Sequence, residues 1–263
     1  MSESNERRFA PSPVKQALRE GNLVVGTFVF EFATNGIGRL AAGAGAQFVI
    51  YDAEHTGWGW ETLGRLVATT QGAEPYIRIP GTERSAISRA LDVGARGIMV
   101  PMVESAEQAA TIVSWATYPP HGVRGAAFGL AHDDYAREDN DTFMRWANEE
   151  KAILAQIETV RGLAAVEEIA AVDGVDVLWV GHYDLTNSMG IPGKFDHPDY
   201  LAALDRVATA ARSHGKHAGF MAGSPAEAAM LVERGFSILA YGGDLWVYQD
   251  ALREGITKVQ GLR

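Results

Sequence analysis

The sequence predicts a (β/α)₈ barrel, a single α/β domain of about 250 residues, and three observations favour it. The chain has 263 residues, of which 47% are hydrophobic, so it can form one such domain with a large core. Eight short apolar runs alternate along it with longer amphipathic segments. The runs are continuously apolar, as expected for parallel strands buried on both faces.

The elements follow in chain order. A first helix is expected at 13–20, because Ser12 and Pro13 are start signals and Gly21 is a stop. Strands are predicted at 23–29, 47–51, 75–79, 97–100, 152–157, 176–180, 217–221 and 237–241. Helical patterns follow them near 35–44, 59–71, 83–93, 105–116, 160–171, 198–214, 225–234 and 244–258. We expect one domain over 1–263 with a short N-terminal extension at 1–12. Since periodicity does not prove closure, an open doubly wound sheet is the alternative.

The connection at 118–151, between the fourth and fifth strands, is unusually long. It contains Pro119 and Pro120, a predicted helix near 141–149 and an acidic cluster, Asp133, Asp134, Glu138, Asp139 and Asp141. Long connections in compact domains are often functional or lie at an interface.

Charge and composition exclude several classes of function. The net charge is −10, so the surface repels nucleic acid and anionic membranes, and neither is an expected partner. The absence of cysteine excludes disulfides, thiolate metal sites and a cysteine nucleophile. The N-terminal residues are polar, and no apolar run approaches the roughly 20 residues of a membrane span. We expect a cytoplasmic protein.

Polar residues gather at the predicted C-terminal ends of the strands, which is where barrels of this type carry out their chemistry. The alternative is that these residues simply begin solvated loops. The N-terminal ends offer fewer: Gln47, Glu74, Lys151 and His217. The polar residues at the C-terminal ends of the strands are Glu31, Asp52, Glu54, His55, Arg78, Gln156, Glu158, His182, Asp184 and Asp244.

Two of these acids, Glu158 and Asp184, follow consecutive strands and can converge on one divalent cation. Without cysteine ligands, two hard carboxylates favour Mg²⁺ or Mn²⁺. The remaining coordination positions would be open to water and to the keto and carboxylate oxygens of a 2-keto acid. The alternative is that both acids cap the helices that follow them, Asp184 at the turn 185–189.

Arg78 and His55 are the other candidate functional residues. Arg78 lies among apolar residues, so we expect it to pair with a carboxylate, either an internal one or that of a substrate. His55 suits general acid–base chemistry and follows Asp52 closely, although a lone histidine is more often structural or exposed.

The lysines argue against a Schiff-base mechanism. The chain has five, and Lys15 and Lys258 lie on terminal helices, while Lys151 and Lys216 precede strands. Only Lys194, in a predicted loop, is a conceivable Schiff-base residue. The positions of the lysines therefore favour metal-assisted chemistry.

Six segments together resemble a known family. They are 52–55 (DAEH), 76–80 (YIRIP), 94–103 (GARGIMVPMV), 118–125 (YPPHGVRG), 156–159 (QIET) and 181–186 (GHYDLT). The sequence resembles the HpcH/HpaI aldolases, class II metal-dependent pyruvate aldolases that include enzymes acting on 2-keto-3-deoxy sugar acids. The resemblance runs from about residue 14 to 258, and it implies a barrel of the phosphoenolpyruvate/pyruvate-binding type.

The resemblance also implies roles for individual residues. Glu158 and Asp184 would hold the metal, Mg²⁺ or Mn²⁺, with Co²⁺ and Zn²⁺ as alternatives. His55, supported by Asp52, would transfer protons, and Asp92 would lie near the aldehyde site, either of its own or of a neighbouring subunit. Relatives typically form hexamers with exchanged C-terminal helices. Many relatives carry proline where this chain has His182. The residues implied to contact pyruvate, by side chain or backbone, are Arg78, Gln156, Gly181, His182, Tyr183 and Asp184.

The implied reaction is the reversible cleavage of a 4-hydroxy-2-keto acid to pyruvate and an aldehyde, which makes the protein a carbon–carbon lyase. Its partners would be these small molecules and further copies of the chain. Two alternatives are a lyase acting on a CoA thioester and a keto-acid-binding protein without catalytic activity. The sequence does not identify the aldehyde.

Overall fold

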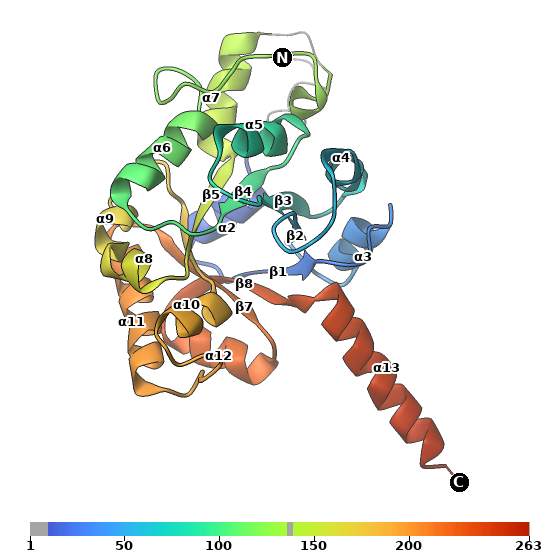
Figure 1. Ribbon diagram of the computed structural model, residues 1–263. Coiled ribbons are helices and arrows are strands. Elements are labelled where there is room, and N and C mark those ends of the chain that lie inside the picture. The colour runs from blue at the N-terminus through green and yellow to red at the C-terminus, as the bar shows by residue number, and fades with distance from the viewer. Residues whose placement is uncertain (1–9, 136–138, 263) are drawn as a thin grey trace.

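Eight parallel strands form a closed barrel in the order β1 to β8, so the predicted (β/α)₈ fold is confirmed and the open sheet is wrong (Figure 1). The computed structural model describes residues 10–135 and 139–262. Each strand ends within two residues of its predicted bounds. The strands are β1 (Val24–Val29), β2 (Phe48–Asp52), β3 (Glu74–Arg78), β4 (Gly97–Val100), β5 (Ala152–Ile157), β6 (Val177–Val180), β7 (His217–Ala222) and β8 (Phe236–Gly243).

Two apolar layers make the core. Side chains such as Phe48, Tyr76, Leu154 and Trp179 fill the barrel interior. Residues of the other strand face pack against the surrounding helices. Because both faces are buried, the strands are apolar throughout their length.

Helices surround the barrel, and most follow the predicted segments. The helix His182–Ser188 and the short 3-10 helix Ala131–Asp133 were not among those segments, and one predicted helix is divided. The expected helix at 160–171 is two short helices that meet at Ala165, whose ψ of 11° lies outside the helical range. The break lets α9 bury Val166 and Ile169 against the core. The helices are α2 (Pro13–Arg19), α3 (Ile37–Gly43), α4 (Trp60–Thr69), α5 (Arg84–Asp92), α6 (Ala106–Ala116), η1 (Ala131–Asp133), α7 (Asn140–Glu150), α8 (Val160–Ala164), α9 (Val166–Ala170), α10 (His182–Ser188), α11 (Pro198–Ser213), α12 (Pro225–Glu233) and α13 (Asp244–Gln260).

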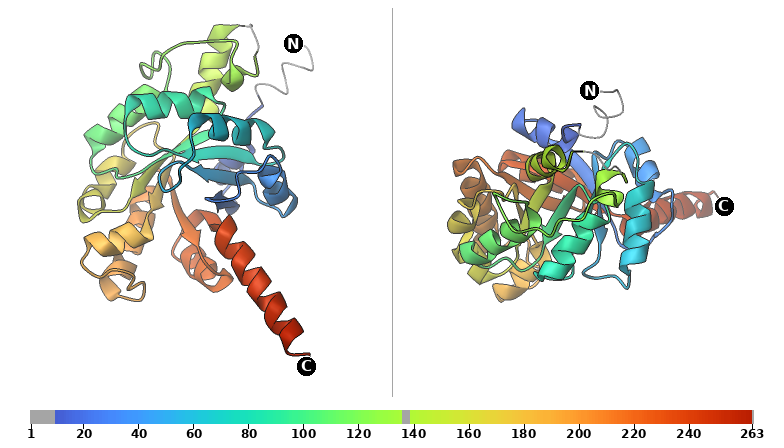
Figure 2. Two further views of the ribbon diagram at one scale, coloured as in Figure 1. Left: turned by 45° about the vertical axis from the view of Figure 1, so that its right-hand side comes forward. Right: turned by 90° about the horizontal axis from the view of Figure 1, so that it is seen from above.

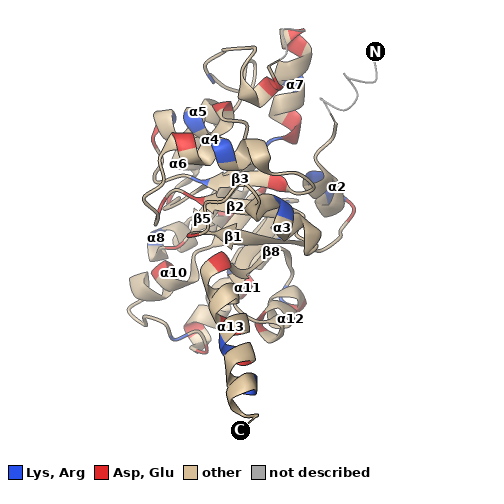
Figure 3. Ribbon diagram, turned by 90° about the vertical axis from the view of Figure 1, so that its right-hand side faces the viewer, with Lys and Arg blue, Asp and Glu red and all other residues tan. Residues whose placement is uncertain are grey.

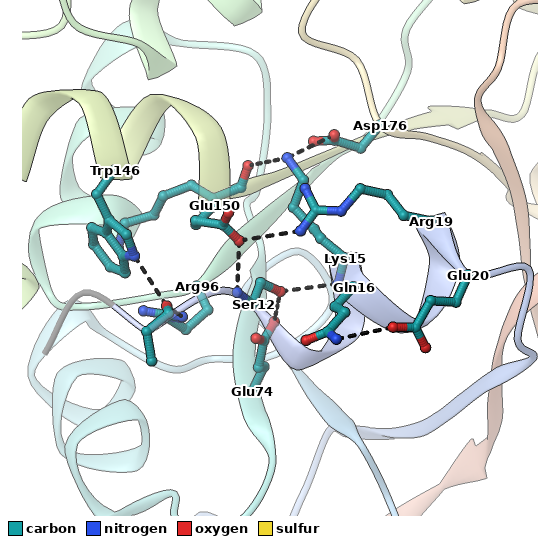
Figure 4. Close-up of polar contacts among 12 residues, drawn as sticks. Ser12, Lys15, Gln16, Arg19, Glu20, Glu74, Arg96, Trp146, Glu150 and Asp176 are labelled. Carbon is teal, nitrogen blue, oxygen red and sulfur yellow. Dashed lines mark hydrogen bonds and ion pairs between the residues drawn. The ribbon is translucent and has the colours of Figure 1, made fainter. Parts of the chain in front are cut away.

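Helix α2 packs against the N-terminal end of the barrel (Figure 4). Ser12 is fully buried, and its hydroxyl donates to Glu74 and accepts from the Lys15 amide. Lys15 forms an ion pair of 2.9 Å with Asp176, whose other oxygen accepts from the backbone of β5. Of the predicted extension 1–12, residues 10–12 therefore pack on the barrel, and 1–9 lie outside the described residues.

The long connection folds over the same end of the barrel. Its apolar side chains, among them Tyr118, Phe143 and Trp146, form a small separate core. Helix α7 begins one residue before its predicted start and carries two of these side chains. Of the acidic cluster predicted here, Glu138 lies outside the described residues.

Helix α13 extends away from the barrel and has no buried residue (Figure 2). It carries acidic and basic residues along its length (Figure 3). Its exposed apolar side chains are Trp246, Val247, Leu252, Ile256 and Val259. Within the described residues, no helix is long and apolar enough to cross a membrane.

Candidate active site

Asp52 and Arg78 end two neighbouring strands and lie directly opposite each other in the β2–β3 register. Asp52 is fully buried, and its Oδ1 lies 2.5 Å from the Arg78 Nε. The guanidinium packs against Phe28 and Phe30, at 5.2 and 5.7 Å from the ring centroids. Buried pairing and aromatic packing fix the orientation of Arg78 at the mouth of the barrel.

The turn after β2 is organised by Asp52. Its carboxylate accepts hydrogen bonds from the backbone amides of Glu54 and His55, at 3.2 and 2.8 Å. Asp52 thus contacts His55 through the backbone. The imidazole is 59% exposed, and its Nε2 lies 3.8 Å from Glu54 Oε2. The same Oε2 lies 3.3 Å from Arg78 Nε.

Glu158 lies just beyond β5 and is 1% exposed. Its Oε1 accepts from the Met102 amide at 2.6 Å, and its Oε2 accepts from the Gln156 side chain. The Gln156 Oε1 is buried and has no hydrogen-bond partner. Gly181 passes so close that a Cβ there would lie 2.4 Å from Glu158 Oε2. A glycine is therefore required beside the carboxylate.

Neither predicted metal-binding acid caps a helix. Thr159 caps α8, since its hydroxyl accepts from Gly162 N at 2.9 Å. Helix α10 begins at His182, earlier than the predicted turn at 185–189, and Asp184 lies exposed in its first turn. The capping alternative is therefore wrong for both acids.

Asp52 and Glu54 share the Arg78 guanidinium, and two further acids, Glu158 and Asp184, lie within electrostatic range of Glu54. Burial, together with the charges of Glu54 and Asp184, raises the pKa of Glu158 to about 7, although hydrogen bonds from Gln156 and Met102 oppose the shift. Burial also raises the pKa of Glu54 to about 6, with Arg78 opposing the shift and Asp52 and Asp184 adding to it. The acids are close enough to repel one another, and a cation between them would relieve that repulsion.

The donor set fits a hard divalent cation. Glu158 and Asp184 supply carboxylate oxygens, and Glu54 adds negative charge within interaction range. No three His, Asp or Glu side chains of the described residues have the arrangement of a complete metal site. With two carboxylate ligands, such a cation would keep positions for water and substrate oxygens, as Mg²⁺ usually does.

His182 and Tyr183 form an aromatic wall next to these acids. The imidazole stacks on Phe220 at 4.9 Å between ring centroids and lies edge-on to Phe195 at 5.3 Å. Burial, and to a smaller extent the charge of Arg78, lower the pKa of His182 to about 4. The two residues line a cavity of about 530 Å³ that extends to Trp246 on α13.

Asp92 lies apart from the other predicted site residues. Helix α5 begins after the C-terminal end of β3 and ends before β4, so Asp92 lies toward the opposite end of the barrel. It forms an ion pair of 2.8 Å with Arg124, whose side chain is 1% exposed. Within one chain it does not join the cluster of Arg78 and Glu158.

Two residues of the site were not singled out from sequence. Glu54 was noted only as a strand-end acid, although its position between Asp52 and His55 was a usable signal. Met102 has a left-handed backbone, with φ of 55°, and donates its amide to Glu158. Almost any residue type can donate its backbone amide, so no sequence pattern would have identified Met102.

Comparison with known proteins identifies the family. Residues 37–251 match the family model described as HpcH/HpaI aldolase/citrate lyase. The chain is 34% identical to a 2-keto-3-deoxy-L-rhamnonate aldolase of Klebsiella pneumoniae, over 92% of this chain and 90% of the relative. It is 34% identical to a hydroxypyruvate/pyruvate aldolase of Cupriavidus necator, over 93% and 91%. The crystal structure of an HpcH/HpaI aldolase from Desulfitobacterium hafniense superimposes with a TM-score of 0.89 at 33% identity, covering 94% of this chain and 96% of that one. The protein belongs to the HpcH/HpaI aldolase/citrate lyase family.

Proposed function

We propose that this aldolase cleaves 4-hydroxy-2-keto acids to pyruvate and an aldehyde, with a divalent cation, Mg²⁺ or Mn²⁺, held by Glu158 and Asp184. The excess of carboxylates around Arg78 at the mouth of the barrel carries the proposal. Its relatives are named as aldolases of a 2-keto-3-deoxy acid and of pyruvate. The cation would supply Lewis acidity at the keto oxygen of the substrate.

Arg78 would stabilise the negative charge that develops on the C2 oxygen as the C3–C4 bond breaks. Its position is held by Asp52, and its terminal amino groups are the donors available to a substrate. Gln156 Nε2 donates to Glu158, and its buried Oε1, which lacks a partner, would accept a hydrogen bond from a substrate hydroxyl or a water molecule. We assign the substrate carboxylate to the backbone amides of residues 182–184.

The proton balance of the reaction involves His55. Cleavage removes the proton of the C4 hydroxyl, releases the aldehyde and leaves the pyruvate enolate, which is then protonated at C3. His55 is exposed and lies near Glu54, which supports the proposal that it would exchange protons through water. Addition of pyruvate to an aldehyde is the same path reversed.

A retro-aldol assay tests this proposal. Purified protein with Mg²⁺ or Mn²⁺ should release pyruvate from 2-keto-3-deoxy sugar acids, and EDTA should abolish the release until metal is restored. Glu158→Gln and Asp184→Asn should each weaken metal binding and lower kcat/KM by about 100-fold or more. Asp205→Asn, on an exposed helix face, is the matched control. Full activity in EDTA, or metal and pyruvate binding without turnover, would contradict the proposal.

We also propose that the enzyme is a homo-oligomer built through α13, with a hexamer as the expected assembly. A helix of 17 residues with no buried side chain lacks the packing that normally stabilises helices in proteins. Beside its base, β1, α3 and α13 line a largely apolar cavity of about 560 Å³. A helix from a second copy of the chain would cover both the exposed side chains of α13 and this cavity. Such an assembly would also give Asp92 access to the active site of a neighbouring subunit.

A further inference from the structure

Asp244 is a strand-end acid that the proposed reaction does not use. It follows β8 directly, as the first residue of α13, beside the place where β8 pairs with β1 (Figure 1). Among the described residues, its carboxylate accepts three hydrogen bonds, all from the backbone of the loop after β1. Its Oδ1 accepts from the Phe30 amide at 2.9 Å, and its Oδ2 accepts from the amides of Glu31 and Phe32 at 3.0 and 2.7 Å.

These three bonds determine the path of the loop after β1. A carboxylate that accepts from backbone amides forms charge-assisted hydrogen bonds, which are stronger than bonds between neutral groups. Because the three amides converge on one side chain, movement of the loop away from β8 would break all three bonds together. The position of the Phe30 backbone therefore depends on Asp244.

The ring of Phe30 is held by the same segment of the chain. It packs edge-on against Trp246, at 5.1 Å between ring centroids. Gly243 lies so close that a Cβ there would be 2.7 Å from the Phe30 ring and 2.8 Å from the Trp246 ring. The φ of Gly243, −131°, is open to any residue, so glycine is needed here for the close approach alone. Residues 243–246 thus fix both the backbone and the ring of Phe30.

Phe30 in turn covers the guanidinium of Arg78. The rings of Phe28 and Phe30 stack at 5.2 Å between centroids, and the guanidinium of Arg78 packs against both of them. The Arg78 side chain is therefore only 10% exposed, although it ends at the mouth of the barrel. An aromatic ring attracts a guanidinium, and it also keeps water away, which strengthens the electrostatic interactions of Arg78.

We propose that Asp244 is a positioning residue, which holds the loop after β1 so that Phe30 orients and shields Arg78. Asp244 acts on Arg78 through Phe30 and not on the substrate. Its effect on catalysis rests on the role of Arg78 in the proposed aldolase reaction.

Steady-state kinetics of pyruvate release test this role. Asp244→Ala removes all three acceptors, so Phe30 should no longer be held over Arg78. We expect kcat to fall about tenfold, roughly the effect of losing one partly buried cation–π contact. KM and metal affinity should change little, because the metal-binding acids keep their positions. The matched control is Asp199→Ala, which removes a 77% exposed acid from the first turn of α11 and should keep full kcat.

A double-mutant cycle distinguishes positioning from a merely structural role. Phe30→Leu removes the ring directly and should lower kcat by a similar factor. Adding Asp244→Ala to Phe30→Leu should lower kcat no further, because the acid then has no ring to position. An unchanged kcat in Asp244→Ala, or effects of the two substitutions that multiply, would overturn the proposal.

Asp244→Asn keeps the test decisive if Asp244→Ala does not fold. Its side chain has the same shape but a single acceptor oxygen, so at least one of the three amides loses its partner. Its kcat should also fall, by a smaller factor, and an unchanged kcat would overturn the proposal.

Failure of the aldolase reaction itself would be seen separately, as no pyruvate release by the unmodified protein with metal. Crystal structures of the unmodified protein and of Asp244→Ala then test the positioning role without activity. The Phe30 ring should leave the guanidinium of Arg78 in the variant, and a ring that stays in place would overturn the role of Asp244.

Discussion

The substitution Gly181→Ala should inactivate the enzyme without unfolding it. Gly181 has φ of −89°, which alanine adopts without strain, so the effect comes from contact alone. The new Cβ would lie 2.4 Å from Glu158 Oε2, 2.7 Å from Glu158 Cβ and 3.0 Å from Gln156 Nε2. The first distance is about 1 Å short of ordinary van der Waals contact. Glu158 or the backbone of residue 181 must therefore move.

The size of the effect follows from that displacement. A misplacement of about 1 Å in a catalytic site typically lowers the rate by about 100-fold. Overpacking a core position costs about 1–3 kcal/mol, less than the about 5–15 kcal/mol that keeps a domain folded. We expect kcat/KM for pyruvate release to fall by about 100-fold and metal affinity to weaken, while circular dichroism stays that of a folded protein.

The control is Gly43→Ala, at an exposed helical position where a Cβ meets nothing within 4 Å. It should keep full activity and be neutral or slightly stabilising. If Gly181→Ala were as active as the unmodified enzyme, Glu158 would not need its present position and the assignment of the site would be wrong.

Three further outcomes are expected. Arg78→Lys keeps the charge but loses the planar fork, so kcat should fall about 100-fold while metal affinity, measured by calorimetry, changes little; an unchanged kcat would exclude the assigned role. The raised pKa of Glu158, from 4.5 to about 7, stabilises the metal-free fold below pH 4.5 and loses this contribution as pH rises through 7. Melting curves should therefore show more stabilisation by Mg²⁺ at pH 8 than at pH 5, and the reverse trend would contradict the metal assignment. Ile256→Asp on α13 should lower the mass measured by light scattering, whereas an unchanged mass would remove α13 from the interface.

The strands were predictable because burial on both faces leaves an apolar run that residue type alone reveals. The same reasoning identified Asp52, Arg78, Glu158 and Asp184 as strand-end residues, since strand ends in a barrel share one face. Helix breaks are harder to predict. Ala165 is a good helix former, and nothing in the segment 160–171 signals that Val166 must turn toward the core.

Contacts between segments that are far apart in the chain could not be predicted from the sequence. The donation from the Met102 amide to Glu158 depends on how β4 and β5 are aligned and on a left-handed backbone at Met102. The pattern at 244–258 predicts a helix, but the direction in which α13 leaves the barrel depends on the backbone at Gly243, where β8 ends and α13 begins. Amphipathic spacing does not distinguish packing on the same chain from packing on another.

Charge balance explains why the site combines a buried arginine with more acids than it can neutralise. A single acid beside Arg78 would form a neutral pair with it, and such a pair would attract a cation only weakly. Asp52 forms that pair, at 2.5 Å, and Glu54 shares the same guanidinium nitrogen at 3.3 Å. Glu158 and Asp184 are then left without a cationic partner among the described residues. In the proposed reaction, Asp52 would hold the guanidinium in place for the substrate, while the unpaired acids would attract a divalent cation.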